Sequence, residues 1–256
     1  LAGDEPVMLT HKLINVPVIV DSNKARGIAT TIEKFNPEII LLDDGFQSLY
    51  IDKKRDCVLI DCSLSVQEYQ LMPKGRLREP LLALRRADFV MFVNRGIINN
   101  SIKETILLIL KQHTIPCLEA SFKSKLYKHN YNTRLLETYD SKEVLELPCV
   151  AIAGIANAQS FLDSADIYCN NVFKDYVFPD HYNYQKNEEY FDIIVGGWEK
   201  TDGRKSNVGI ITTLKDYVKI VQLPCVQLKK YSLYVIDINI VTDDENRLFE
   251  LILREG

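Results

Sequence analysis

The stretch Ala87-Asp-Phe-Val-Met-Phe-Val-Asn94 decides the fold class of this chain. Its apolar residues are consecutive rather than alternating, which is typical of a strand buried on both faces. Residues 37–42 and 57–60 have the same pattern, and apolar residues recur at helical spacing over 23–35 and 101–112. Such strands and helices together predict an α/β fold with a mostly parallel sheet.

Apolar strands resume in the second half of the chain after a polar interruption. Residues 121–132 are polar and aromatic, which predicts an exposed strand or a linker. Uniformly apolar runs follow at 148–154, 207–211 and 233–238, and a helix with one apolar face is expected over 244–254. We therefore expect a second α/β unit in this half of the chain.

We expect two α/β/α units joined by short linker strands. The first is a domain over residues 1–118 with a short buried strand at 16–20, the linker strands cover 119–147, and a carboxyl-terminal α/β domain covers 148–256. The chain begins at Leu1 without an initiator methionine, so we expect it to be part of a longer protein.

Composition excludes several classes of protein. The 256 residues are 46% hydrophobic and 26% charged, which is ordinary for a globular protein and excludes disorder. The net charge of -4 argues against general electrostatic binding of nucleic acid, which needs a surplus of cations. The apolar runs are far shorter than the roughly 20 residues of a membrane-spanning helix. The six cysteines have no Cys-x-x-Cys spacing, so we expect free thiols rather than disulfides or zinc.

Two acidic pairs are candidates for chemistry. Asp43 and Asp44 follow an apolar run, at the strand end where parallel sheets bind ligands, and the pattern matches a Walker B strand whose aspartate holds Mg²⁺. The alternative is that they only cap the turn at Gly45. Asp4 and Glu5 precede Pro6; they form either a metal or base site or simply the start of a helix.

Basic and imidazole groups provide further candidates. Arg76 and Arg78 lie in a Pro-rich loop and either bind phosphate or are solvated. His181 follows Asp180, and a histidine oriented by a carboxylate is a common acid–base arrangement. The Thr and Lys side chains of residues 212–216 follow an apolar strand and either contact a ligand or cap a helix. The sequence contains no Gly-x-x-x-x-Gly-Lys-[Ser/Thr] loop.

The order of these motifs is more specific than any one of them. Along the chain they are Gly3-Asp-Glu-Pro6, Asp43-Asp-Gly-Phe-Gln47, Pro73-Lys-Gly-Arg-Leu-Arg-Glu-Pro80, Ala153-Gly-Ile-Ala156, Phe178-Pro-Asp-His-Tyr182 and Thr212-Thr-Leu-Lys-Asp216. This series resembles the tetraacyldisaccharide 4'-kinase family of lipid A biosynthesis over nearly the whole chain. The resemblance implies that the first domain is a truncated, P-loop kinase-like one.

The resemblance also implies an activity and a set of roles. The γ-phosphate of ATP would pass, with Mg²⁺, to the 4'-hydroxyl of a tetraacylated glucosamine disaccharide 1-phosphate. The protein would work as a peripheral protein at the cytoplasmic face of a Gram-negative inner membrane. Asp4 and His181, each from a different domain, would form the catalytic pair. The Mg²⁺ ligands would be Asp43, Asp44 and Glu5.

The remaining roles and the departures from the family also follow from the resemblance. Asp44 and Gln47 would contact the nucleotide, and Arg76 and Arg78 would lie near substrate or phosphate. The family usually has His where this chain has Ser48, and its P-loop precedes the Gly-Asp-Glu-Pro motif. Without that loop we expect the 256 residues to be a fragment that does not turn over alone. The alternatives are a non-catalytic degenerate homologue or accessory binding protein, and another Mg²⁺-dependent enzyme.

Overall fold

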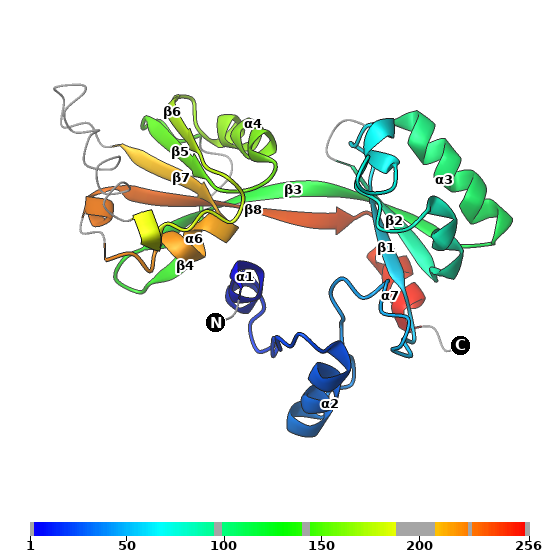
Figure 1. Cartoon of the computed structure of the whole chain (residues 1–256). Helices are drawn as coiled ribbons and strands as arrows, with labels where there is room; N and C mark the ends of the chain where they lie inside the picture. The colour runs from blue at the N-terminus through cyan, green and yellow to red at the C-terminus, as the bar shows by residue number, and fades with distance from the viewer. Residues whose placement is uncertain (1–2, 95–98, 140–143, 188–207, 225–226, 254–256) are drawn as a thin grey trace. The chain divides into compact units, whose positions relative to one another are not determined.

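The computed structural model describes residues 3–94, 99–139, 144–187, 208–224 and 227–253. The chain divides into two compact units that alternate along the sequence (Figure 1). Unit 1 comprises Leu1–Gly27 and Ser124–Ile238, and unit 2 comprises Ile28–Lys123 and Asn239–Gly256. Two long strands, β3 (Cys117–Asn130) and β8 (Ser232–Thr242), and helix α2 (Lys24–Phe35) pass from one unit into the other.

Unit 2 is built on three parallel strands. In order they are β1 (Cys57–Asp61), β2 (Phe89–Asn94) and the first part of β3. The central strand β2 buries both of its faces, as its uniform sequence predicts. Its even-numbered residues pack with α3 (Asn100–Gln112), and its odd-numbered residues pack with α7 (Glu245–Leu253). The short helices η1 (Val66–Tyr69) and η2 (Leu81–Arg86) complete this unit among the described residues.

Unit 1 is built on four further parallel strands. Its strand order is β6 (Val172–Val177), β5 (Cys149–Ala153), β7 (Gly209–Thr213) and β8, and β4 (Leu135–Thr138) pairs antiparallel with β3. Alternate residues of β5 enter two separate cores, one with α4 (Ala158–Tyr168) and the other with α6 (Leu214–Ile220). Helices α4 and α6 therefore cover opposite faces of these strands (Figure 1). Helix α1 (Asp4–Lys12) packs against α6; η3 (Gln185–Asn187) and η4 (Gln227–Lys230) are single turns.

The predicted α/β fold with a mainly parallel sheet is confirmed. The helices predicted from residue 23, 101 and 244 are present as α2, α3 and α7, and the apolar runs at 57–60 and 148–154 form β1 and β5. The five described cysteines are free thiols, and Cys225 lies outside the described residues. No helix in the described part of the chain is long and apolar enough to cross a bilayer.

Two predicted strands are wrong. Residues 16–20 and 37–42 form no strand, and Leu41 is 85% exposed. The backbone has positive φ angles at Asn36 and Asp44, so it turns at both ends of the second segment. An apolar run predicts a buried strand only where a neighbouring strand pairs with it, and neither segment has such a partner among the described residues.

The units divide the chain differently from the predicted domains in two respects. Residues 239–256 belong to the same unit as residues 28–123, although they were expected in the carboxyl-terminal domain. Residues 1–27 belong to the same unit as residues 124–238, because α1 packs on α6. Strands β3 and β4 lie in the segment expected to hold linker strands. The division at 118 and 147 stays a prediction.

Candidate active site

The first turn of α1 carries two carboxylates that meet two lysines of α6. Asp4 and Glu5 lie in that first turn, where a negative charge is favourable beside the unpaired N–H groups of the helix. The Asp4 carboxylate lies 3.3 Å from Lys219 Nζ, and the Glu5 carboxylate lies 3.7 Å from Lys215 Nζ. The lysines are four residues apart and so lie on one face of α6. These charge pairs hold α1 against α6.

His181 faces the same carboxylate. It follows β6 in a turn closed by a hydrogen bond from Tyr182 N–H to the carbonyl of Pro179 (3.1 Å), and its own φ is 58°. The imidazole Nδ1 lies 3.3 Å from Asp4 Oδ2. The structure thus brings together two side chains that are 177 residues apart. Both belong to unit 1, whereas the resemblance implied that each comes from a different domain. The His181 side chain is 59% exposed and that of Asp4 is 27% exposed, so a substrate can reach the pair.

Lys215 and Asp180 surround the other side of the imidazole. Lys215 Nζ donates to Asp180 Oδ1 at 3.2 Å and lies 3.5 Å from His181 Nε2. The Asp180 carboxylate also accepts the backbone N–H of His181 at 2.9 Å. Partial burial opposes ionisation of Asp180, but the hydrogen bond and charge of Lys215, with the contacts to His181, hold its pKa below the ordinary value. Asp180 is therefore a fixed negative charge at neutral pH.

A fully buried carboxylate lies beneath this surface cluster. Asp216 accepts hydrogen bonds from Gly154 N–H (2.9 Å), Thr213 Oγ1 (2.8 Å) and the Tyr184 hydroxyl (3.1 Å). Burial, reinforced by the charge of Asp216, raises the pKa of Tyr184 far above its ordinary value, so the hydroxyl remains a donor. A Cβ at residue 154 would lie only 3.0 Å from the Tyr182 side chain and 3.1 Å from Asp216 Oδ1. Glycine therefore lets the backbone come close enough to donate.

The predicted acidic turn at residues 43–45 belongs to unit 2 and is much more exposed. Asp44 has a φ of 49° and lies 3.3 Å from Arg78 Nη1, and these side chains are 72% and 60% exposed. Arg76 pairs instead with Glu68 at 3.2 Å. Asp43 and Gln47 are exposed, whereas Ser48 is buried and donates its N–H to the carbonyl of Gly45. The turn thus gathers Asp44 and Arg78 but leaves Arg76 with another partner.

The donors of this turn fit a Mg²⁺ ion that is shared with a phosphate. The described residues contain no group of three or more His, Cys, Asp or Glu side chains that could hold a metal by themselves. Mg²⁺ in nucleotide sites needs only one or two carboxylates, because phosphate oxygens and water supply the other ligands. Asp43 and Asp44 are such a pair. Glu5 belongs to unit 1, where it faces Lys215.

Sequence reasoning missed two residues of the cluster around Asp4. Lys219 contacts both Asp4 and Asp216, and Tyr184 donates to Asp216. The repeat of lysine at positions 215 and 219 was a usable signal, because this spacing puts both cations on one helix face. Tyr184 gave no signal, since its role depends on Asp216 of α6, which lies 32 residues away in sequence.

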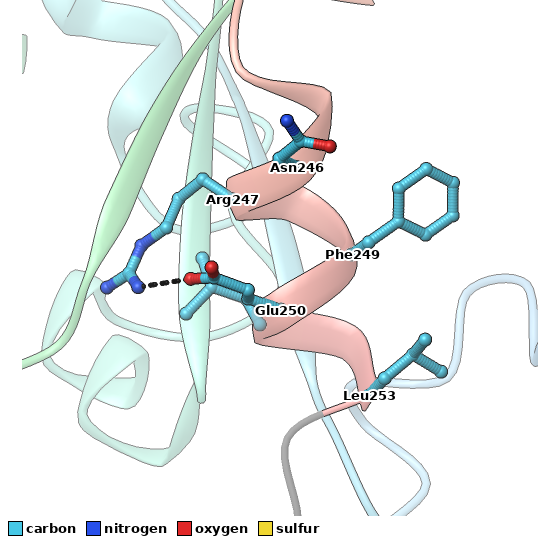
Figure 2. Close-up of a pocket in the computed structure, with 6 residues that line it drawn as sticks. Asn246, Arg247, Phe249, Glu250 and Leu253 are labelled. Carbon is cyan, nitrogen blue, oxygen red and sulfur yellow. Dashed lines mark hydrogen bonds and ion pairs between the residues drawn. The ribbon is translucent and has the colours of Figure 1, made fainter.

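The described structure also has a surface pocket away from these residues. It is lined by six residues of α7, namely Asn246, Arg247, Phe249, Glu250, Leu251 and Leu253 (Figure 2). Arg247 and Glu250 form an ion pair at 2.9 Å along the helix. None of the predicted site residues lines this pocket, so it lies outside the candidate site.

Comparisons with known proteins agree on one family. The profile of the tetraacyldisaccharide-1-P 4'-kinase family matches residues 1–255. A tetraacyldisaccharide 4'-kinase of Halothermothrix orenii is 31% identical and covers 93% of this chain and 63% of its own length. One of Desulfotalea psychrophila is 32% identical, with 86% and 60% covered. The chain thus spans less than two thirds of the length of these relatives.

A solved structure has the same fold. The crystal structure of LpxK from Aquifex aeolicus in complex with ATP superposes with a TM-score of 0.64, covering 98% of this chain and 68% of that one. The two sequences are 22% identical. At this identity the likeness establishes the fold, which agrees with the α/β architecture described above.

Proposed function

This chain belongs to the tetraacyldisaccharide-1-P 4'-kinase family, and we propose that it carries the acid–base centre of such a kinase. The reaction is transfer of the γ-phosphate of ATP to the 4'-hydroxyl of a tetraacylated glucosamine disaccharide 1-phosphate, a step of lipid A biosynthesis. The single observation that carries the proposal is the 3.3 Å contact between Asp4 and His181. The names of the relatives supply the substrate.

Asp4 is the proton acceptor in this proposal. A sugar hydroxyl is a poor nucleophile, and a carboxylate within reach takes its proton as the oxygen–phosphorus bond forms and the bond to the departing ADP breaks. His181 orients the carboxylate through Nδ1 and is itself flanked by Lys215 and Asp180. The exposure of both side chains leaves room for the acceptor hydroxyl.

Nucleotide and metal are assigned to the other carboxylates. Asp43 and Asp44 would hold Mg²⁺ together with phosphate oxygens. When bound, Mg²⁺ neutralises charge that develops on the transferred phosphoryl group. Gln47 contacts the nucleotide with Asp44. We assign Arg76 and Arg78 to phosphate or substrate, because a guanidinium matches anionic oxygens.

We place the reaction at the cytoplasmic face of the inner membrane. The substrate is an acylated disaccharide, so the enzyme has to meet a lipid surface. The net charge of -4 disfavours broad adhesion to anionic lipid, and the contact is therefore local and partly apolar.

The test is phosphoryl transfer by the full-length protein that contains these residues. Labelled ATP, Mg²⁺ and the tetraacyldisaccharide 1-phosphate should yield a 4'-phosphorylated lipid. His181→Ala should cut turnover about a hundredfold or more while circular dichroism stays unchanged. A folded wild-type protein that transfers no phosphate would favour a non-catalytic homologue, which the replacement of the family's His by Ser48 would also fit.

A further inference from the structure

Lys219 is a nearly buried cation that contacts Asp4 of the proposed catalytic pair and the backbone next to His181. Its side chain is 15% exposed, and Nζ lies 3.3 Å from Asp4 Oδ2. The same nitrogen donates to the carbonyl of Tyr182 at 3.2 Å, one residue beyond His181. An ammonium group has three donors, and the third faces Asp216 Oδ1 at 3.3 Å. The ring of Tyr184 lies 5.4 Å from the charge.

These contacts connect Asp4 to a fully buried carboxylate of unit 1. The Asp216 carboxylate is completely buried and is held by a backbone N–H of residue 154 and by two hydroxyls. Lys219 extends from this buried anion to the partly buried carboxylate of Asp4. A charged hydrogen bond in a site with little water is stronger and more directional than the same bond in solvent.

We propose that Lys219 is a positioning residue, which fixes the Asp4 carboxylate and the His181 turn relative to one another through the buried Asp216. The inference rests on the proposed function of the Asp4–His181 pair. A single ammonium ion holds the acceptor from one side and the backbone next to the imidazole from the other. Its loss leaves the binding of substrates intact but lets the carboxylate move away from the geometry needed for proton transfer.

The kinetic test compares Lys219→Met with Lys12→Met. Lys12 is a matched control, because it also ties α1 to unit 1, through a 2.9 Å ion pair with Asp237, but does not touch Asp4. We expect Lys219→Met to lower kcat about ten- to a hundredfold with KM for ATP and for the lipid within twofold of wild type. Lys12→Met should keep wild-type kcat. Equal values of kcat in wild type and a folded Lys219→Met protein would overturn the proposal.

A second variant covers the case in which Lys219→Met does not fold. Lys219→Arg keeps the positive charge that compensates Asp216, so it preserves the fold, but its planar fork cannot occupy the same three contacts. A several-fold loss of kcat at unchanged KM is expected. A wild-type kcat in Lys219→Arg would show that charge alone suffices and that positioning is not the role.

A spectroscopic measurement separates this inference from the proposed activity. The ¹⁵N resonance of His181 Nδ1 should move in Lys219→Met in the direction in which it moves in Asp4→Asn, because both changes disturb the same contact. It should stay in place in Lys12→Met. A shift in a protein that phosphorylates no lipid would keep the positioning role and refute the proposed function. An unmoved resonance would refute the positioning role whatever the activity.

Discussion

The cluster around Asp4 and the turn around Asp44 are both acidic, but they are built in opposite ways. Asp4 is three-quarters buried and lies within 3.3 Å of both His181 and Lys219. Asp44 is 72% exposed, and the partner named above, Arg78, is itself 60% exposed. The first arrangement is packed against the core of the folded chain, whereas the second presents its charges to solvent.

The difference separates two kinds of functional group. A group that moves a proton needs a defined position before substrate arrives, so the fold has to supply its partners. A group that binds a metal–phosphate complex can be ordered by its ligand, because Mg²⁺ brings its own geometry. In this account unit 1 supplies the first kind and unit 2 supplies the second. Substitutions at Asp216, Asp44 and His129 test this difference between the two units.

The largest effect on stability is expected for Asp216→Ala. Removing this buried carboxylate leaves the N–H of residue 154, two hydroxyls and the ammonium of Lys219 without their acceptor. The free energy of unfolding should fall by about 3 kcal/mol, measured by urea denaturation. The control change Asp44→Asn removes an exposed charge but keeps a side chain that tolerates the left-handed φ of this residue, and it should alter the unfolding free energy by less than about 0.5 kcal/mol. Equal losses in the two variants would contradict the contrast between the two sites.

An effect of intermediate size is expected for Asp44→Asn. It should change the Mg²⁺ dependence of activity and leave stability unchanged. Replacing the carboxylate by an amide weakens a Mg²⁺ ligand but leaves the exposed turn folded. The Mg²⁺ concentration needed for half-maximal phosphoryl transfer should rise about tenfold, while the urea midpoint stays that of wild type. An unchanged Mg²⁺ requirement would remove Asp44 from the metal site.

The smallest expected effect is on the pH dependence of stability, through a buried histidine in the core beneath α6. His129 is buried and its Nδ1 lies 3.0 Å from the Tyr217 hydroxyl. Burial lowers the pKa of His129, so the unfolded chain takes up a proton at a higher pH than the folded chain does. Stability should therefore be full above about pH 6.5 and fall as the pH drops below that value. Urea midpoints from pH 7.5 to 5 measure this slope, and His129→Gln should reduce it. A slope that His129→Gln leaves unchanged would assign the loss to other groups.

The parallel strands were well predicted from the sequence, because a strand buried on both faces has an uninterrupted run of apolar residues. Strand β2 is the best example, since its neighbouring residues enter opposite cores. The same apolar pattern gave a wrong prediction at residues 37–42. There, positive φ angles at Asn36 and Asp44 turn the chain, and Leu41 is exposed to solvent. An apolar run shows that a segment favours a buried position, but the segment forms a strand only where a neighbouring strand pairs with it.

The candidate site was predictable only where a motif could be compared with a family. Composition and spacing alone left His181 as one candidate among several, and the resemblance paired it with Asp4. No local pattern predicts a contact across 177 residues. Lys219 and Tyr184 belong to no motif that the resemblance supplied, and their roles depend on how α6 packs against α1 and β5. Tertiary packing therefore added the part of the site that holds Asp4 in place.

The central claim is that Asp4 and His181 act as one unit in proton transfer. The most direct measurement is kcat for Asp4→Asn, His181→Ala and the double variant, made in the full-length protein that contains these residues. Residues that work as a unit are non-additive, so the double variant should be no more than about threefold slower than the slower single variant. A double variant whose loss equals the product of the two single losses would show that the residues act independently and would contradict the account.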